Sequence, residues 1–323
     1  MGKDGQILAT LADGQFHSGQ ELAEQFGLSR SGIWKAIQLL QSKGVEVFAV
    51  QGKGYRLAQP LELLNAATIQ ASIADDRGAF PGEVTVLWDV DSTNRYLVER
   101  ASNGCAAGST CLAEMQTAGR GRRGREWVSP LGGNIYLSQL WQFNCGPAQL
   151  SGLSLAAAIA VVRVIHRLGI ASAGLKWPND ILVNGEKLAG ILLEIQGESS
   201  GPSNVVVGLG VNVRIPESIS ATIDQPHTSM EKLLGKPVRR NQLAANLIRE
   251  MMSVYEIFMQ KGFAAFLEEW CALDVYQSKK VNLTLPAGVI TGISRGVDIS
   301  GALKLEQNGE ISSFQSGEIS LRG

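Results

Sequence analysis

The chain has 323 residues, with 29 Lys and Arg against 30 Asp and Glu, a formal net charge of -1, and 45% hydrophobic residues. This length suits two or three domains with buried cores, and the balanced charge excludes a chain-wide attraction to nucleic acid, so that any DNA contact must come from a local element. The four cysteines form no CxxC pair and have no metal-ligand histidine spacing, which favours reduced thiols in a cytoplasmic protein.

The first 60 residues have the helix-start and helix-stop signals of a small helical module. The polar start Met1–Asp4 lacks the apolar stretch of a signal peptide. Ser18 and Glu21 have the spacing of a capping box, and Gly27 is placed to end that helix. Ser29 can cap a further helix only two residues later. The pattern predicts a helix-turn-helix from Gly19 to Gln38.

A predicted β-hairpin follows this module. Strand-like residues at 45–50 and 55–57 flank a glycine turn at 51–54, which is typical of the wing of a winged helix. Residues 1–60 hold six Lys or Arg against five Asp or Glu, so one copy should bind DNA weakly and a repressor would need to dimerise. A protein-interaction role for the module stays open. The side chains expected to face DNA are those off the apolar stripe of the second helix and two in the wing: Arg30, Ser31, Trp34, Lys35, Gln38, Lys53 and Arg56.

Strands and helices alternate from about residue 63, which predicts an α/β domain over 63–274. A type I′ turn is expected at Asn184-Gly185. The apolar run near 150–165 is interrupted by Arg163, so we expect a core helix there and no membrane partner. Short strands with glycine turns then predict a small β domain over 275–323, after a winged helix-turn-helix domain over 1–62.

The segment Gly119–Arg125 places four arginines and three glycines in seven residues. Glycine lets backbone approach a ligand closely, and arginine offers a cationic fork for phosphate or carboxylate, so the segment is expected to close over an anion. A solvated basic loop, or one that touches nucleic acid nonspecifically, is the alternative. Its GxGxxG spacing is not expected to bind a dinucleotide, because no helix follows; and no Gly-Lys pair is followed by Ser or Thr, which excludes a P-loop.

Four motifs in sequence order carry a family resemblance. They resemble the motifs of bifunctional biotin protein ligases and biotin operon repressors, and with the predicted outer modules the resemblance covers nearly the whole chain. It implies a multidomain α/β (α+β) fold with a class II synthetase-like ligase domain and a C-terminal SH3-like β-barrel. The motifs are Asp91-Ser92-Thr93-Asn94, Gln116 with Gly119-Arg120-Gly121-Arg122, Lys176-Trp177-Pro178-Asn179-Asp180, and Lys187-Leu188-Ala189-Gly190-Ile191.

The resemblance implies a two-step reaction. The biotin carboxylate would join the α-phosphate of ATP as biotinyl-5′-AMP, and the acyl group would then pass to a lysine of the biotin carboxyl carrier protein of acetyl-CoA carboxylase. The adenylate would also act as corepressor, favouring a homodimer on the operator DNA of biotin synthesis genes. The first step needs no general base, because such a carboxylate is ionised at pH 7; it needs cations and positioning. His17, His166 and His227 accordingly lie outside every motif.

The resemblance also implies roles for single residues. Lys187, Arg120 and Lys176 would be catalytic, and Asp180 would bind Mg²⁺. The biotin-binding residues would be Ser92, Thr93, Asn94, Gln116, Arg120, Gly121, Arg122 and Lys187. The ATP-binding residues would be Arg122, Trp127, Lys176, Asn179, Asn212 and Arg322.

Two other functions remain open at this point. One is a transcription factor whose ligase-like domain only senses a small molecule, against which the intact Lys187, Arg120 and Asp180 argue. The other is a lipoate-type ligase, although the polar set at 92–94 and Gln116 suits a ureido ring better than a dithiolane. The sequence departs from the family's repressor pattern at Gly32 and Trp34, so the resemblance does not fix the operator sequence.

Overall fold

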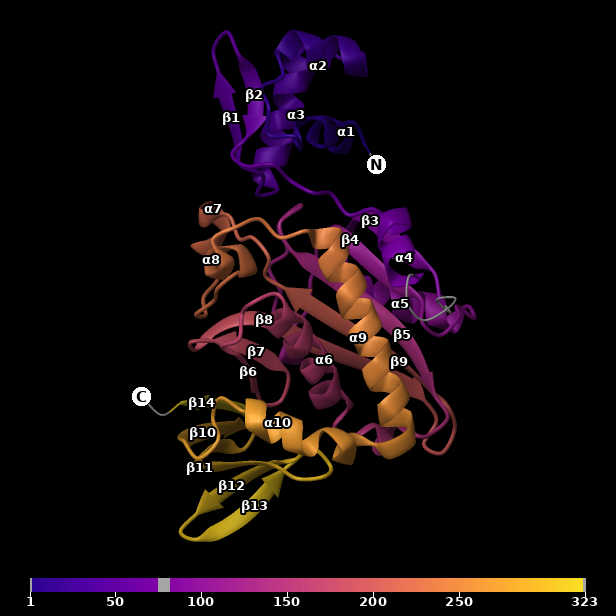
Figure 1. The fold of residues 1–323 in the computed structure, drawn as a ribbon, viewed down its shortest axis with the longest axis vertical. Coiled ribbons are helices and arrows are strands. Elements are labelled where there is room, and N and C mark those ends of the chain that lie inside the picture. The colour runs from indigo at the N-terminus through magenta and orange to yellow at the C-terminus, as the bar shows by residue number, and fades with distance from the viewer. Residues whose placement is uncertain (1, 75–81, 322–323) are drawn as a thin grey trace.

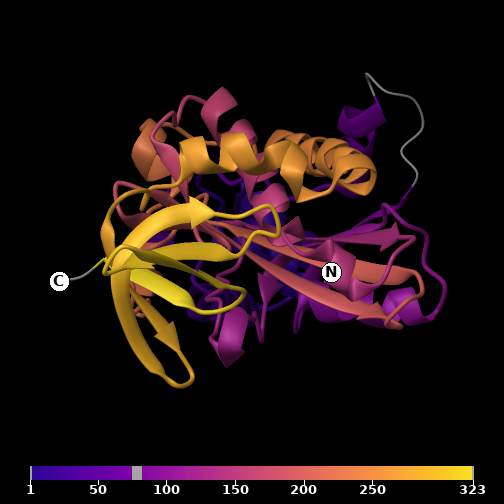
Figure 2. The same cartoon turned by 90° about the horizontal axis from the view of Figure 1, so that it is seen from below.

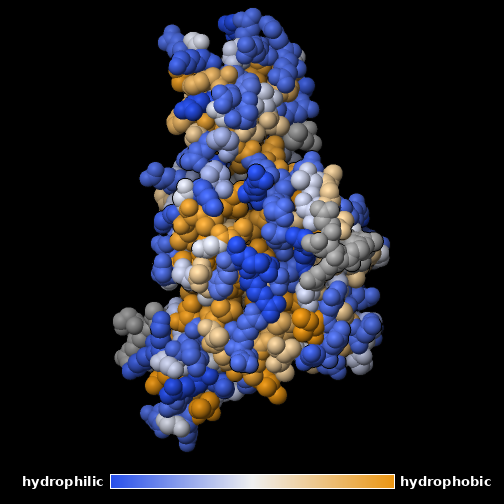
Figure 3. All heavy atoms as spheres, viewed as in Figure 1, coloured by the Kyte–Doolittle hydropathy of each residue, from blue (hydrophilic) through white to orange (hydrophobic). Residues whose placement is uncertain are grey.

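The computed structural model describes residues 2–74 and 82–321. Three parts follow one another along its long axis (Figure 1): a helical N-terminal module at one end, a large mixed sheet with helices in the middle, and a small β-sheet at the other end. On the face in Figure 3 the N-terminal end is mostly hydrophilic, and hydrophobic residues gather over the middle of the molecule.

The N-terminal module has the predicted helix-turn-helix and hairpin. The Ser18 hydroxyl accepts from the Glu21 N–H at 3.0 Å and the Glu21 carboxylate accepts from the Ser18 N–H at 3.0 Å, while Gly27 ends the helix with φ 62°. These local bonds satisfy helix-end donors, which is why the sequence signals were reliable here. Its elements are α1 Lys3–Leu11, α2 Gly19–Phe26, α3 Arg30–Ser42, β1 Val47–Val50 and β2 Gly54–Leu57.

The central part is built on a seven-stranded sheet. Its first two neighbours, β3 and β4, are parallel, and all its other neighbouring pairs are antiparallel. Asn184 and Gly185 both have positive φ in the β7–β8 turn, as the type I′ prediction requires. In spatial order the strands are β3 Val84–Val90, β4 Thr110–Gln116, β5 Ile135–Phe143, β9 Ser203–Val211, β8 Glu186–Gly197, β7 Asp180–Val183 and β6 Ala173–Lys176.

Helices cover both faces of this sheet. The longer ones, α6 and α9, pack on one face with the main core, including Leu137 and Val207 (Figure 2). Helix α5 covers the other face over Leu140 and Val206, as the alternation of strand side chains requires. The helices are α4 Ala66–Ala74, α5 Thr93–Ser102, α6 Leu153–Arg167, α7 Glu217–Ser220, α8 Met230–Leu234, α9 Arg240–Lys261 and α10 Leu267–Leu273, with 3₁₀ turns at Arg122–Gly124, Pro147–Leu150 and Phe263–Phe266.

The segment Pro147–Arg167, which contains α6, is apolar and long enough to cross a membrane by composition alone. In its most apolar window 67% of the residues are buried inside the protein. Its packing against α9 and the sheet makes it a core helix, as its sequence predicts.

The last part is a five-stranded antiparallel sheet. The carbonyl of Gly301 accepts a 3.0 Å hydrogen bond from the indole N–H of the buried Trp177, which joins this sheet to the motif before β7. In spatial order its strands are β13 Glu310–Phe314, β12 Leu303–Gln307, β11 Gly288–Val297, β10 Lys280–Leu285 and β14 Glu318–Leu321.

A buried ion pair joins β4 and the start of α9 in the central domain. Arg240 at the start of α9 donates to the Glu114 carboxylate at 2.9 Å, and both side chains are 3% exposed. Arg240 also donates to the carbonyls of Asn134 and Glu62, and Glu114 accepts from the N–H of Leu64. The pair is therefore fully hydrogen-bonded, the condition under which buried charges are tolerated.

Candidate active site

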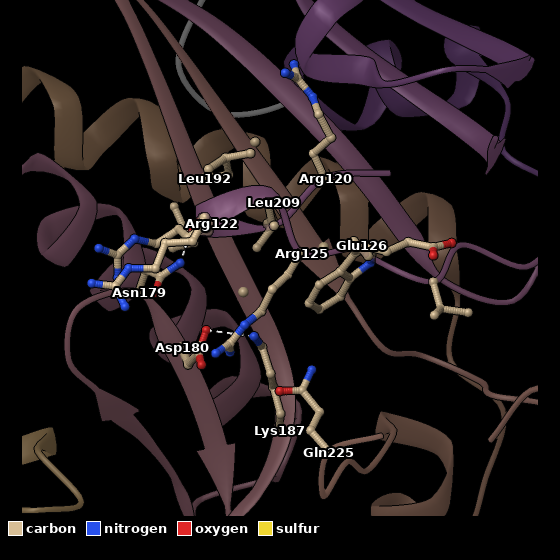
Figure 4. Close-up of a pocket in the computed structure, with 18 of the residues that line it drawn as sticks. Arg120, Arg122, Arg125, Glu126, Asn179, Asp180, Lys187, Leu192, Leu209 and Gln225 are labelled. Atoms are coloured by element: carbon tan, nitrogen blue, oxygen red, sulfur yellow. Dashed lines mark hydrogen bonds and ion pairs between the residues drawn. The ribbon is translucent and has the colours of Figure 1, made fainter. Parts of the chain in front are cut away.

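A cavity of about 640 Å³ opens on the sheet face that α5 covers. Its walls come from distant parts of the chain, including the Gly119–Arg125 loop, strands β8 and β9 and the segment 222–227 (Figure 4). The turn before α5, and Gly317 and Glu318 at the start of β14, complete them. One end is neutral and polar, and the other is cationic.

The polar end is a buried hydrogen-bond network at the start of α5. Gln116 accepts at its Oε1 from the N–H of Thr93 at 2.9 Å and from the Thr93 hydroxyl at 3.2 Å. The hydroxyl of Ser138 lies 2.6 Å from Asn94 Oδ1, and Asn94 donates to the carbonyl of Leu192 at 3.2 Å. Ser92 is the N-cap residue of α5 by position, but its side chain makes no capping bond. These fixed dipoles can recognise a neutral polar ring.

Three glycines let the side chains of Asn94 and Trp127 pack directly on the middle of the sheet. A Cβ on Gly208 would lie 2.0 Å from Asn94 Oδ1, and one on Gly210 would lie 2.4 Å from the Trp127 ring. A Cβ on Gly190 would lie 3.1 Å from the same ring. Glycines inside strands commonly mark such close approach of a ligand or another chain segment.

The cationic end is centred on Lys187. Its ammonium lies 2.8 Å from the Asp180 carboxylate, each side chain being 16% exposed, and 5.3 Å from the centroid of the Trp127 ring. Lys176 is mostly enclosed nearby, and burial lowers its pKa against the opposing effect of Asp180. Two cations are thus held in a pocket with little solvent, where they act strongly on a bound anion.

The arginines of the loop differ in direction and partner. Arg120 points away from the Asp180–Lys187 pair and donates to Glu194 at 3.0 Å, whereas Arg125 points toward the pair (Figure 4). Arg125 makes a bidentate bond to Glu318, at 2.8 and 2.6 Å. Arg122 donates to the carbonyl of Gly317 at 3.4 Å, and burial, followed by the charge of Arg123, lowers its pKa. The loop is therefore tied both to β8 and to the C-terminal sheet.

Most of the predicted site residues share this cavity. Arg322 lies outside the described residues. The following predicted residues line the cavity: Ser92, Thr93, Asn94, Gln116, Arg120, Gly121, Arg122, Trp127, Lys176, Asn179, Asp180, Lys187 and Asn212.

Sequence reasoning missed three contributors. Ser138 and Glu318 belong to no motif, and their positions follow from strand pairing and from contact between domains. His227 also lies outside every motif, yet it lines the cavity, because the backbone of Lys187 bonds to Pro226 and Thr228 on either side of it. The glycines of β9 were the one available signal that this sheet face meets a ligand.

Comparison with known proteins decides the family. Residues 88–212 match the biotin/lipoate A/B protein ligase family, 5–56 match a helix-turn-helix domain, and 279–322 match the biotin protein ligase C-terminal domain. The bifunctional ligase/repressor BirA of Escherichia coli is 44% identical over 98% of this chain and 96% of its own length. BirA of Bacillus subtilis is 32% identical over 99% and 98%. The chain belongs to the bifunctional biotin protein ligase and repressor family.

The solved structures agree with this assignment. A biotin protein ligase from Aquifex aeolicus in complex with biotin and ATP has a TM-score of 0.63 and 29% identity, covering 74% of this chain and 98% of that one. As a member of this family, the chain is a biotin protein ligase with a helix-turn-helix repressor domain, which excludes the sensor-only reading.

The repressor domain presents the predicted α3 residues to solvent. Arg30, Ser31, Trp34, Lys35 and Gln38 are all exposed, as is Lys53 in the hairpin. Arg56 differs, because its guanidinium lies 5.1 Å from the Phe16 ring and 5.4 Å from the Phe48 ring. Cation–π contacts hold Arg56 between two aromatic rings, whereas the Lys53 ammonium lies 5.7 Å from the centroid of the Phe16 ring alone.

Proposed function

We propose that the cavity binds biotin beside ATP, joins them as biotinyl-5′-AMP, and passes the biotinyl group to one lysine of a biotin carboxyl carrier protein. The observation that carries this proposal is the continuity of the polar end with the cationic end in one cavity of about 640 Å³. That arrangement suits a molecule with a neutral ring at one end and a carboxylate at the other.

The ureido ring binds at the polar end. A urea has one carbonyl acceptor and two N–H donors, and Ser92, Thr93, Asn94 and Gln116 offer both kinds of group. Gly208, which has no Cβ, lets the Asn94 amide lie against the sheet at this end. This polar set favours biotin over lipoate, whose dithiolane would leave buried donors and acceptors without partners.

Activation of the biotin carboxylate depends on neutralising the negative charges of the two substrates and on positioning them. A carboxylate oxygen of biotin attacks the α-phosphorus, and the bond to pyrophosphate breaks without a proton transfer. Lys187 would contact both the carboxylate and the α-phosphate, with Lys176 as the second cation. Arg120, Gly121 and Arg122 close over the tail of biotin. For this, Arg120 breaks its bond to Glu194 and binds the substrate instead. Cations aimed at developing negative charge lower the barrier.

The nucleotide binds beside Trp127, whose ring covers the glycines of β8 and β9. Trp127 stacks on adenine with the ring face that is turned away from Gly210. Asn179, Asn212, Arg122 and Arg322 complete the nucleotide site.

Mg²⁺ would bind through Asp180 and the phosphates. Among the described residues no cluster of three His, Cys, Asp or Glu side chains is arranged to hold a metal. Mg²⁺ usually takes one or two carboxylates together with substrate phosphates, so a single carboxylate fits. The ion would add positive charge at the phosphates, and Lys187 would release Asp180 to it.

The second step is acyl transfer to the carrier. The acceptor amine attacks the anhydride carbonyl, AMP leaves, and the amine loses a proton. Until the carrier arrives, the Gly119–Arg125 loop shields the anhydride from water.

The adenylate also serves as corepressor. Beyond Leu192, β8 pairs only with β9 among the described residues, and Ile195 on this stretch is 40% exposed. An open strand edge of this kind can pair with a second copy, bringing two helix-turn-helix modules to the operator of biotin synthesis genes. The carrier competes for the same edge. Sedimentation with and without biotin and ATP tests this dimerisation; unchanged association contradicts it.

Finer points of architecture belong to the same proposal. The domains span 1–62, 63–274 and 275–323, the central one of class II synthetase type and the last an SH3-like barrel, and the protein acts in the cytoplasm.

ATP–pyrophosphate exchange with biotin or lipoate tests the ligase proposal. Exchange with biotin at least about tenfold faster than with lipoate is expected, because each unpaired buried polar group costs about 1–3 kcal/mol. Lys187→Ala should abolish exchange and carrier labelling, whereas Lys232→Ala, at a side chain 65% exposed, should leave both intact. Faster exchange with lipoate, or full activity of Lys187→Ala, contradicts the proposal.

A further inference from the structure

Trp34 is the largest exposed apolar side chain on the predicted DNA-facing helix. Its side chain is 54% exposed, although Ile33, Ile37 and Leu40 on the same helix are buried in the module core. Within the described ranges the Trp34 ring makes no hydrogen bond, ion pair or ring contact. A single exposed apolar residue is common on protein surfaces, so the place of Trp34 on the helix of the helix-turn-helix domain that is expected to face DNA carries the argument.

Three polar side chains around Trp34 already have partners. Arg30, one turn earlier, donates to Gln20 at 2.7 Å, and Gln38, one turn later, donates to Gln41 at 2.9 Å. Ser31 lies 2.9 Å from the hydroxyl of Ser29. These bonds fix the side chains of Arg30, Ser31 and Gln38, whereas the indole ring of Trp34 has no such contact among the described residues.

The charge around Trp34 suits a polyanionic partner. Between residues 30 and 57 there are five basic side chains and one acidic one, and Lys43 is engaged with Asp4 at 3.0 Å. The basic ones are Arg30, Lys35, Lys43, Lys53 and Arg56, and the acidic one is Glu46. Such a local excess favours DNA over an apolar protein surface.

We propose that Trp34 recognises a thymine in the major groove of each operator half-site. Thymine alone presents a 5-methyl group next to an O4 acceptor. The apolar indole face can cover the methyl group while the indole N–H, which is only a donor, bonds to O4. Cytosine at that position presents an N–H₂ donor and no methyl group, so it opposes the indole. This inference rests on the repressor role and adds the base that one residue reads.

Deoxyuridine substitution tests the contact directly. Full-length protein with biotin and ATP is first used to select duplexes from a random-sequence library. In the selected duplex each thymine is then replaced in turn by deoxyuridine, which removes only the methyl group. Wild type should bind about 5- to 10-fold more weakly when one particular thymine of each half-site is replaced. Trp34→Ala should bind both duplexes measurably and equally, with unchanged protection of the α3 amides from hydrogen exchange as the check on folding of the N-terminal module.

Leu39→Ala is the matched control, because Leu39 is an exposed apolar residue (46%) on the same helix. It should keep the full wild-type ratio. The proposal is overturned if wild type shows no thymine-to-deoxyuridine effect at any position, or if Trp34→Ala shows the same effect. Weaker self-association of Trp34→Ala with an unchanged ratio would assign the ring to a protein contact and also overturn it. A library without enrichment would contradict the repressor role itself, and this inference with it.

Discussion

The backbone N–H of Leu131 donates a 3.0 Å hydrogen bond to the carbonyl of Lys43, which lies just after α3. The Leu131 side chain is 3% exposed and belongs to the core of the N-terminal module, together with Ile33, Ile37 and Leu40. Leu131 follows Trp127 by only four residues, so the chain that leaves the ligand cavity enters the DNA-binding module directly.

Leu131→Ala should loosen the N-terminal module. Loss of a buried leucine side chain costs about 2–5 kcal/mol, because a cavity remains. Hydrogen exchange of the α3 amides should therefore accelerate, while exchange in β5 and β9 stays unchanged. Leu39→Ala, at an exposed position of the same helix, should leave the α3 amides as protected as in wild type. Equal protection in both variants would show that the Leu131 side chain does not stabilise the module.

Gly208→Ala should block the polar end of the cavity. The new Cβ would lie 2.0 Å from Asn94 Oδ1, so Asn94 must leave its bonds to Ser138 and Leu192. We expect the biotin dissociation constant, measured by calorimetry, to rise at least about 100-fold, which is about 2.7 kcal/mol. Gly201→Ala is the control, because its nearest neighbour would be 3.5 Å away. Wild-type affinity in Gly208→Ala would place biotin elsewhere.

Substitutions at Arg122 and Arg123 distinguish the effect of where an arginine lies from the effect of its charge alone. Arg122 is half-buried and burial lowers its pKa, whereas Arg123 is exposed with φ 57°. Arg122→Gln should slow single-turnover adenylate formation by about 10- to 100-fold, because an enclosed cation stabilises the transition state more than a solvated one. Arg123→Gln, which removes the same charge, should slow it by less than about threefold. Equal effects would mean that net charge alone matters.

Asp274 should make stability depend on pH. Burial raises its pKa to about 6, and its Oδ2 is buried with no hydrogen-bond partner among the described residues. The unfolded value is about 3.9, so the folded state holds the proton more tightly. The stabilisation is therefore complete below about pH 4 and is lost as pH rises toward 6.

Asp274→Asn should remove this penalty. In urea unfolding at pH 7.5 the variant should be more stable than wild type by up to about 3 kcal/mol, with the difference vanishing near pH 4. Asp89→Asn, at an exposed position, should match wild type at both values. A variant less stable than wild type at pH 7.5 would show that Asp274 is stabilising when charged.

Local signals in the sequence predicted local structure well. The capping box of Ser18 and Glu21, the stop at Gly27 and the Asn184-Gly185 turn each depend on residues within a few positions, so their outcome is fixed by nearby chemistry. The site motifs were predicted from their resemblance to a known family, and the structure brings their described residues together at one cavity.

Contacts between distant segments were not predictable in this way. Glu318 reaches Arg125 across 193 residues, and Leu131 enters the core of a module that ends about 70 residues earlier. No periodicity in the sequence identifies such partners, because a single glutamate or leucine can pair with many other residues of the chain. The stacking of Arg56 on Phe16 and Phe48 was missed for the same reason.

The ion pair of Glu114 and Arg240 has a consequence for engineering. These side chains hold the linker through the N–H of Leu64 and the carbonyl of Glu62, and Asn241 binds the carbonyl of Leu63. A truncated ligase that lacks the N-terminal DNA-binding module should therefore start near residue 60. A chain that starts after Asn65 would lack the backbone groups of residues 62–64, so Arg240, Glu114 and Asn241 would lose hydrogen-bond partners. Such a truncated enzyme should be less stable for a reason unrelated to the loss of the DNA-binding module.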